Sequence, residues 1–218
     1  KKIFKTFKNE KKIKVLKNLS QNFDKGKSYS IMGPSGSGKS TLLNLISLID
    51  RPSSGSIHFD KIPVNFNESE KNDVYRSKKI GIVYQQNNLL PDFTALENIY
   101  LASLAINDNK ELAISNAEKL LKKIGLSKRA DHFPSQLSGG EAQRVAIARA
   151  IVNDPEIILA DEPTGSLDME TAKDVFELLN KQKRSDRLII FATHNRFFAN
   201  KADYLLELTD GSIKSTNV

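Results

Sequence analysis

Cysteine is missing from this sequence, which excludes disulfide bonds and thiolate metal sites. Long apolar runs are missing as well, since even the stretch Leu45–Ile49 is far shorter than the roughly 20 apolar residues that a membrane-spanning helix needs. The N-terminus is basic, but no apolar stretch follows it that could serve as an export signal. We therefore expect a cytosolic protein with no segment that crosses a bilayer.

Positive charge is in excess, with a formal net charge of +7 over 218 residues. The lysines are scattered, without an arginine-rich or aromatic-interleaved block, so the charge does not by itself indicate a nucleic-acid site. A basic surface could equally face an anionic inner leaflet, or be a solvated surface and nothing more. The length, with 39% hydrophobic residues, allows one large domain or one domain with an inserted lobe.

Short apolar runs alternate with stretches of helical periodicity, which predicts an α/β fold. Two of the runs, Ile157–Ala160 and Leu188–Ala192, are apolar throughout, as expected for parallel strands covered on both faces. Asp210 and Gly211 predict a tight turn into a last short strand, and hence an antiparallel edge. The predicted strands are Lys2–Phe7, Tyr29–Met32, Ser56–Asp60, Ile80–Tyr84, Glu156–Ala160, Leu188–Thr193 and Tyr204–Thr209.

The middle of the chain has helical periodicity instead. Helices are predicted over Ala95–Leu104, Lys110–Ile124 and Gly139–Val152. We interpret residues 87–152 as a helical lobe inserted into an α/β core that residues 1–86 and 153–218 form.

The strongest local signal is a glycine-rich loop between the predicted strand Tyr29–Met32 and a helical run over Thr41–Ile49. Glycines let successive backbone N–H groups point at phosphate oxygens, and the helix adds the positive end of its dipole. Lys39 supplies a charge for the outer phosphates, and the Ser40 hydroxyl is placed to ligate Mg²⁺. The residues expected to bind nucleotide here are Gly33, Pro34, Ser35, Gly36, Ser37, Gly38, Lys39, Ser40 and Thr41.

A pair of carboxylates narrows the chemistry. The predicted strand Glu156–Ala160 runs directly into Asp161 and Glu162. This order places Asp161 near the Mg²⁺, usually through a water, and Glu162 beside the attacking water as general base. Asp-Glu-Pro is a common turn composition, but following a phosphate loop it favours the catalytic interpretation.

A second anion site is predicted at the start of the helix after Ser138. Ser138 lies at an N-cap position with Glu141 three residues on, which is a capping box, and Gly139 and Gly140 leave the first amides accessible. Two phosphate sites in one domain suggest that each nucleotide lies between the loop of one copy and this helix end of another. A well-capped amphipathic helix with no ligand is the alternative.

Leu137–Glu141 resembles the signature motif of the ABC ATPases, and the resemblance covers nearly the whole chain. Gln85 matches the Q-loop glutamine, which links the nucleotide to the membrane partner. His194 matches the switch histidine, which contacts the γ-phosphate.

Two further matches are weaker. Asp168 ends a stretch that resembles the D-loop, although the family more often has Ala or Asn where this chain has Ser166. Phe7 matches the aromatic residue that stacks on adenine, with Phe4 as a nearby alternative.

The resemblance implies a RecA-like P-loop NTPase core with an inserted helical lobe, and an ATPase that uses ATP and Mg²⁺. Glu162, His194 and Gln85 would be catalytic; Ser40, Gln85 and Asp161 would hold the metal, the last through a water. The implied partners are a second copy of the chain and integral membrane permease subunits that dock near Gln85. The expected location is the cytoplasmic face of the bacterial inner membrane, and no nucleic-acid partner is expected.

The stretch Asn88–Asn98 is similar to the ATPases of the bacterial lipoprotein-releasing (Lol) transporters. That group also includes macrolide-export, antimicrobial-peptide-export and cell-division ATPases, which stay as alternatives. DNA-repair ABC proteins carry long coiled coils or zinc-binding cysteines, and translation factors carry two cassettes, which this sequence does not match. An ATP-binding scaffold without turnover would conflict with the presence of Glu162 and His194.

Replacing Lys39 by Ala is expected to weaken nucleotide binding itself, because a charge that faces the β- and γ-phosphates is lost. Equilibrium titration with a fluorescent ATP analogue measures the effect. An unchanged affinity would mean that the loop binds through its backbone alone.

Replacing Gly140 by Asp is expected to block the closure of two copies, because the new carboxylate would repel the phosphate held by the opposite copy. Hydrolysis should then collapse while a monomer still binds ATP, as phosphate-release and titration assays would show.

Overall fold

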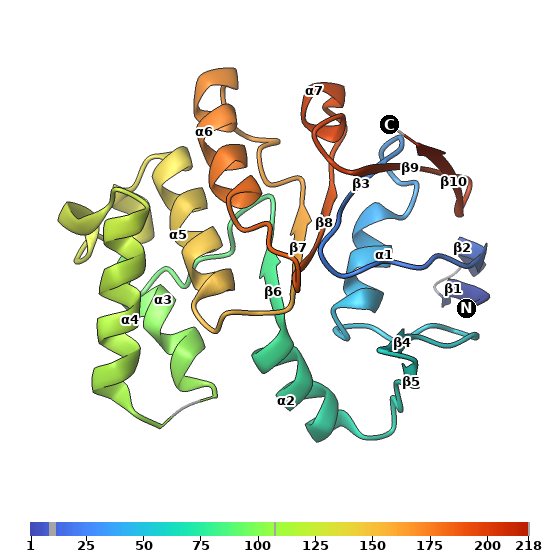
Figure 1. Ribbon diagram of the computed structural model, residues 1–218, viewed down its shortest axis with the longest axis horizontal. Helices are drawn as coiled ribbons and strands as arrows, with labels where there is room; N and C mark the ends of the chain where they lie inside the picture. Colours follow the sequence, from blue (N-terminus) through green and yellow to red (C-terminus); the bar gives the residue numbers. More distant parts are fainter. Residues whose placement is uncertain (9–11, 107, 218) are drawn as a thin grey trace.

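The computed structural model describes residues 1–8, 12–106 and 108–217. Its centre is a six-stranded sheet in the order β10-β9-β3-β8-β7-β6, accompanied by two small two-stranded sheets (Figure 1). The strands are β1 (Ile3–Lys8), β2 (Lys12–Leu19), β3 (Ser28–Met32), β4 (His58–Phe59), β5 (Ile62–Pro63), β6 (Ile80–Val83), β7 (Ile157–Asp161), β8 (Leu188–Ala192), β9 (Tyr204–Thr209) and β10 (Ser212–Asn217). The helices are α1 (Lys39–Ile46), α2 (Ser69–Lys79), α3 (Ala95–Leu104), α4 (Lys110–Lys123), α5 (Gly139–Ile151), α6 (Met169–Asn180) and α7 (Arg196–Ala199), with short 3₁₀ turns at Ser127–Arg129 and Pro134–Gln136.

The strands β9, β3, β8, β7 and β6 pair in parallel, as the apolar runs of β7 and β8 predict for those two strands. β10 alone runs antiparallel within this sheet, and it pairs with β9 across the turn at Asp210 and Gly211. The antiparallel edge predicted from that turn is thereby confirmed.

Alternate residues of the central strands face opposite sides of the sheet. Leu159 and Ile190 pack in a core with α1 and the β1–β2 hairpin. Ile158 and Ile189 pack in a second core with α5, α6 and α7. Both sheet faces are therefore covered, which leaves the strand ends to hold a ligand.

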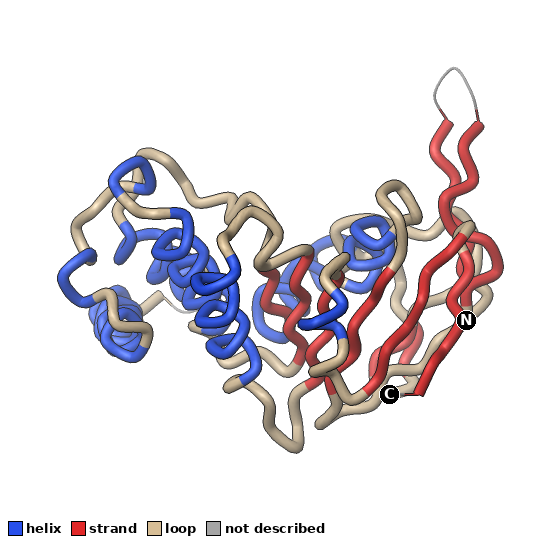
Figure 2. Tube along the Cα trace, turned by 90° about the horizontal axis from the view of Figure 1, so that it is seen from above, coloured by secondary structure: helices blue, strands red, loops and turns tan. Residues whose placement is uncertain are grey.

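Helices α3, α4 and α5 pack around a third core, which contains Ile99, Leu121 and Val145. Figure 2 shows these helices on one side of the molecule and the strands on the other. Helix α5 belongs to two cores, because Val145 faces the helices while Ile147 faces the sheet. No described helix is long and apolar enough to cross a membrane.

The helix predicted over Ala95–Leu104 agrees with α3 residue for residue, and those predicted over 110–124 and 139–152 each end one residue earlier. The strand predicted over Ser56–Asp60 shrinks to His58–Phe59. The sequence interpretation missed β2, α2, α6 and α7. Helix α2 contains no buried residue, so it has no apolar stripe that periodicity could detect.

A candidate nucleotide-binding site

The glycine-rich loop joins the end of β3 to the start of α1. Gly36 and Gly38 adopt φ values of +77° and +104°, which side chains rarely tolerate. A Cβ at Gly38 would also lie 2.9 Å from Val15 Cγ1. The N-cap of α1 is Gly38, which has no side chain that could accept hydrogen bonds from the first amides of this helix.

Lys39, the first residue of α1, spans this loop. Its ammonium group donates to the carbonyl oxygens of Gly33, at 2.8 Å, and Pro34, at 3.2 Å. The positive charge is thus held over the loop, beside the helix N-terminus, where an anion is favoured.

A cavity of about 500 Å³ joins this loop to the ends of three other strands. It forms because the carboxyl ends of β3, β6, β7 and β8 meet at one edge of the sheet. The residues that line it are Val15, Ser35, Gly36, Gly38, Lys39, Ser40, Thr41, Gln85, Asp161, Glu162 and His194. Residues far apart in the sequence that were expected to share a site therefore do so. Gly33, Pro34 and Ser37 belong to the loop but do not line the cavity.

Glu162 and His194 lie side by side because β7 and β8 pair up to Asp161 and Ala192. The Glu162 amide donates to the Ala192 carbonyl at 3.0 Å. One Glu162 carboxylate oxygen, Oε2, lies 2.9 Å from His194 Nδ1 and accepts from the His194 amide at 3.3 Å. Glu162 has a φ of +47°, an unusual value for a non-glycine residue, and such strain concentrates at functional sites.

The Asp161 carboxylate fits a metal-binding role. Its Oδ1 atom is buried and has no hydrogen-bond partner among the described residues. A buried acceptor normally has a partner, so this atom requires a water or an ion. Ser40 lies in the same cavity, and a hydroxyl with a carboxylate is a ligand set that suits Mg²⁺. Across residues 1–8, 12–106 and 108–217, no group of three His, Asp or Glu side chains could hold a metal alone.

Gln85 lies two residues after the end of β6 and reaches the turn after Glu162. A Cβ at Gly165 would lie 3.1 Å from Gln85 Nε2, and the Gly165 amide donates to the Glu162 carbonyl at 3.0 Å. The absence of a side chain at Gly165 therefore leaves room for Gln85 beside the carboxylates.

Ser138, Gly140 and Asp168 do not line this cavity. The predicted capping box is confirmed: Ser138 Oγ accepts from the Glu141 amide at 3.2 Å, and the Glu141 carboxylate accepts from the Ser138 amide at 2.8 Å. The Ser138 amide, helped by the Arg129 guanidinium at 2.9 Å, lowers the pKa of Glu141. Asp168 is the N-cap of α6 and accepts from the Glu170 and Thr171 amides.

The position of Gly140 bears on the Gly140→Asp prediction, which assumed that only the new charge would matter. Gly140 is buried, and an added Cβ would overlap Thr171 Cγ2 in the same chain. The Gly140→Asp substitution would therefore force the Thr171 side chain to move whether or not a phosphate is present, so it does not isolate the effect of the charge. Gly139 is exposed, and its Cβ would meet only Leu167 Cδ2, at an ordinary 3.4 Å.

Phe7 lies outside the cavity but near its edge. It pairs with Ile13 across the β1–β2 ladder, two residues from Val15, which lines the cavity. Phe4 instead forms a bridge with Ser54 at the other end of the hairpin. Position in the hairpin therefore favours Phe7 over Phe4 as the aromatic residue beside a bound base.

Val15 is a lining residue that the sequence interpretation missed, because β2 was not predicted. The alternation of charged and apolar residues from Lys12 to Val15 is the signal that could have found it.

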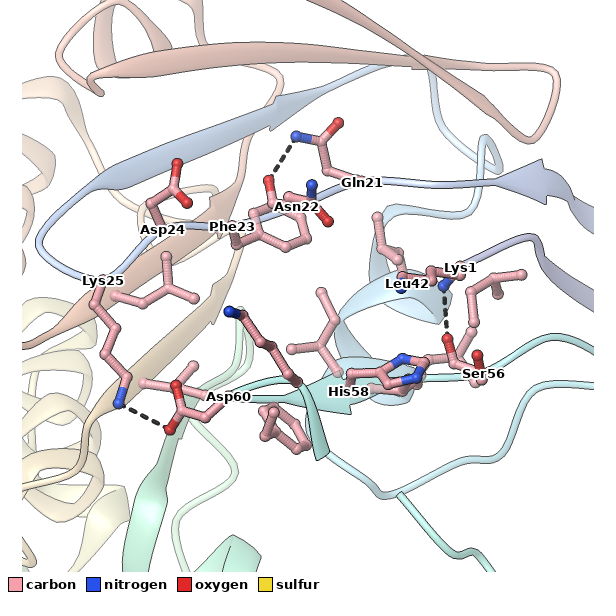
Figure 3. A pocket seen from close by; sticks show the side chains of 18 of the residues that line it. Lys1, Gln21, Asn22, Phe23, Asp24, Lys25, Leu42, Ser56, His58 and Asp60 are labelled. Atoms are coloured by element: carbon pink, nitrogen blue, oxygen red, sulfur yellow. Dashed lines mark hydrogen bonds and ion pairs between the residues drawn. The ribbon is translucent and has the colours of Figure 1, made fainter. Parts of the chain in front are cut away.

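A larger cavity of about 650 Å³ lies at the opposite, amino-terminal ends of the strands (Figure 3). Three of its charged side chains form ion pairs: Lys25 contacts Asp60 at 3.0 Å and Glu156 at 3.1 Å. None of the residues predicted to bind nucleotide lines it.

Comparison with known proteins agrees with this geometry. The sequence model of the family described as "ABC transporter" matches residues 16–165, more than half of the chain. The chain belongs to the ABC transporter family. ABC proteins similar to it include the lipoprotein-releasing system ATP-binding protein LolD of Ehrlichia ruminantium, with 43% identity over 98% of this chain and 94% of that protein. LolD of Bordetella pertussis is 42% identical over 93% of this chain and 88% of that protein.

The macrolide export ATP-binding/permease protein MacB of Mannheimia succiniciproducens is 43% identical over 94% of this chain and 32% of that protein. Among solved structures, the dimeric ATP-binding cassette MJ0796 in a post-hydrolysis state with ADP and Pi superposes with a TM-score of 0.92. The two chains are 40% identical, and the match covers 100% of this chain and 97% of that one. The chain is thus an ATP-hydrolysing subunit of the ABC type, with the P-loop core, antiparallel edge and inserted helices expected from its sequence.

Replacing Glu162 by Gln is expected to lower ATP turnover by about 10²–10⁴-fold, the range for the loss of a general base. ATP affinity should persist, because the Gln side chain keeps the shape and the phosphate loop is untouched. Single-turnover phosphate release measures the first quantity, and titration with a fluorescent ATP analogue the second. Near-normal hydrolysis would exclude Glu162 from proton transfer.

Proposed function

We propose that two copies of the chain close around two ATP molecules, each with Mg²⁺, and that closure and hydrolysis drive a membrane permease. The observation that carries this proposal is the division of the predicted site. One cavity gathers the phosphate loop with Gln85, Asp161, Glu162 and His194, while Ser138 and Asp168 lie outside it at two helix N-termini.

Within one copy, the loop amides and Lys39 bind the phosphates. Ser40, Gln85 and Asp161 would hold Mg²⁺, Asp161 through a water, and the ion would neutralise charge that develops on the phosphates. Glu162 accepts the proton of the attacking water, and His194, held beside Glu162, contacts the γ-phosphate. Phe7 stacks on the adenine.

The second half of each site comes from the other copy. The amides of Gly139 and Gly140, which the Ser138 capping box does not use, offer an anion site at the start of α5, with Gly140 packed against α6. Asp168 caps α6 directly beside it. The start of α5, which carries the signature motif, and the D-loop stretch that ends at Asp168 therefore form one rigid surface. Release of the γ-phosphate removes the ligand that both copies share, and the pair opens.

A permease docks on the segment after Gln85. Leu90 and Phe93 there are 43% and 39% exposed, and Phe133, from the adjoining loop, is 42% exposed. The loops adjoin because the Ala95 amide donates to the His132 carbonyl at 2.8 Å. We take residues 87–152 as the helical lobe and residues 1–86 and 153–218 as the nucleotide-binding core, between which the permease inserts.

Buried Asn98 makes this docking surface rigid before binding. Its amide oxygen accepts from the Leu90 amide at 2.8 Å, and its nitrogen donates to the carbonyls of Leu90, Phe93 and Thr94 at 2.9–3.1 Å. A preformed surface loses little conformational entropy on association.

The transported molecule is a lipoprotein that leaves the inner membrane, which places this chain on the cytoplasmic face of that membrane. Support comes from LolD relatives that are 42–45% identical over 92–98% of the chain. A related exporter is the second candidate, supported by the 43% identity to MacB. Reconstitution with a lipoprotein-releasing permease tests the first: lipoprotein release that needs ATP and Glu162 supports it, and stimulation only by a macrolide-type permease contradicts it.

Replacing Gly139 by Asp is expected to abolish the ATP-dependent dimer, because a carboxylate would face the phosphate of the opposite copy. Gly139→Asn has nearly the same size without the charge and is the matched control, so it should lose far less. Sedimentation with ATP, performed in the Glu162→Gln background, measures dimer formation, and titration measures monomer affinity. Equal loss in both variants, or loss of monomer affinity, would contradict the two-copy site.

A further inference from the structure

Arg149, near the end of α5, forms hydrogen bonds with the segment that follows Gln85. Its guanidinium donates to the carbonyls of two successive residues, Asn87 at 2.7 Å and Asn88 at 2.8 Å. Figure 1 shows the chain between β6 and α3 passing beside α5. Both asparagines have a φ of +48°, a conformation that Asn tolerates better than most residues.

Gln143, two turns earlier on α5, makes a parallel contact. Its side chain is buried and donates from Nε2 to the Tyr84 carbonyl at 3.0 Å. Gln143 and Arg149 therefore hold the chain on both sides of Gln85, one immediately before it and the other two and three residues after it.

The Arg149 contact resists separation. Burial lowers the pKa of this guanidinium, although an arginine stays charged in proteins. No carboxylate lies within ion-pair distance of it in the described ranges, so the two carbonyls compensate for much of its lost hydration. Moving the loop away from α5 would leave a half-buried charge without these acceptors, which is unfavourable.

Ser138 is the N-cap of α5, so the same helix carries the predicted second half of the nucleotide site. Its capping box fixes Ser138 relative to the helix. A displacement of Gln85 that carries Arg149 with it must therefore also displace Ser138.

We propose that Arg149, supported by Gln143, is a positioning residue that couples Gln85 in one nucleotide site to Ser138, which serves the other site. Gln85 and α5 move as one body, so events at the γ-phosphate of one site are transmitted to the partner site through this chain. The inference rests on the proposed roles of Gln85 and Ser138.

The test is a double-mutant cycle on ATP turnover with Gln85→Ala and Ser138→Ala, measured in the parent chain and in Arg149→Lys. Lysine keeps the charge, but its single ammonium does not reproduce the forked contact to two carbonyls. Coupled residues give a combined loss smaller than the product of the single losses. In the parent we expect a combined loss smaller than the product of the single losses. In Arg149→Lys we expect the combined loss to equal that product. Arg149→Lys alone should lower turnover about tenfold, a factor that corresponds to the energy typical of charge-assisted hydrogen bonds.

The matched control is Arg184→Lys, because Arg184 makes ion pairs with Asp154 and Asp186 away from the nucleotide cavity. In the Arg184→Lys background, the combined loss from Gln85→Ala and Ser138→Ala should stay smaller than the product of the single losses. Monomer ATP affinity and the thermal midpoint should stay near parent values in Arg149→Lys, since the phosphate loop and the cores are intact.

A combined loss in Arg149→Lys that stays smaller than the product, as in the parent, would overturn the inference, because the coupling would then pass through the nucleotide. Loss of monomer affinity together with the thermal midpoint would also overturn it, since Arg149 would then only support packing. If Gln85→Ala and Ser138→Ala each leave turnover unaltered, the proposed function itself fails, and that result is distinct from both.

Discussion

The pairing register of β7 and β8 is the constraint on which the site depends. Asp161 pairs with Ala192, so the next residues of both strands leave the sheet together. That register brings the Glu162 amide to the Ala192 carbonyl and its carboxylate to His194. A slip by one residue would exchange the faces of the whole strand, and the apolar cores on both sides exclude it. The chemistry at the strand ends is therefore fixed by apolar packing along the strands.

Much of this arrangement could be predicted from the sequence because its signals are local. The glycine loop, Lys39, the acids after a buried strand and the Ser138 capping box each depend on neighbouring residues. Contacts between distant segments could not be predicted in the same way. The packing of Gly140 against Thr171 depends on how α5 meets α6, and the position of Val15 depends on a hairpin that folds over the loop.

The contacts of Arg149 could not be predicted from the sequence either. In sequence it is a basic residue near a helix C-terminus, where a favourable interaction with the helix dipole is sufficient to explain it. Only the fold shows that two carbonyls from a segment about sixty residues earlier meet its guanidinium. The positioning role proposed for Arg149 could therefore not be inferred without knowing the route of the chain between β6 and α3.

The position of α5 in two cores has a consequence for how this chain folds. Ile147 and Ile151 complete the core beneath the sheet, and Val145 and Ala148 complete the core among the helices. Neither core is filled without this helix, so the helical lobe is not a separable folding unit. Unfolding either core removes the partner surface of the other, which favours a single cooperative transition. A fragment that spans α3 and α4 alone would expose Ile99 and Leu121 to water and would lack a core of its own.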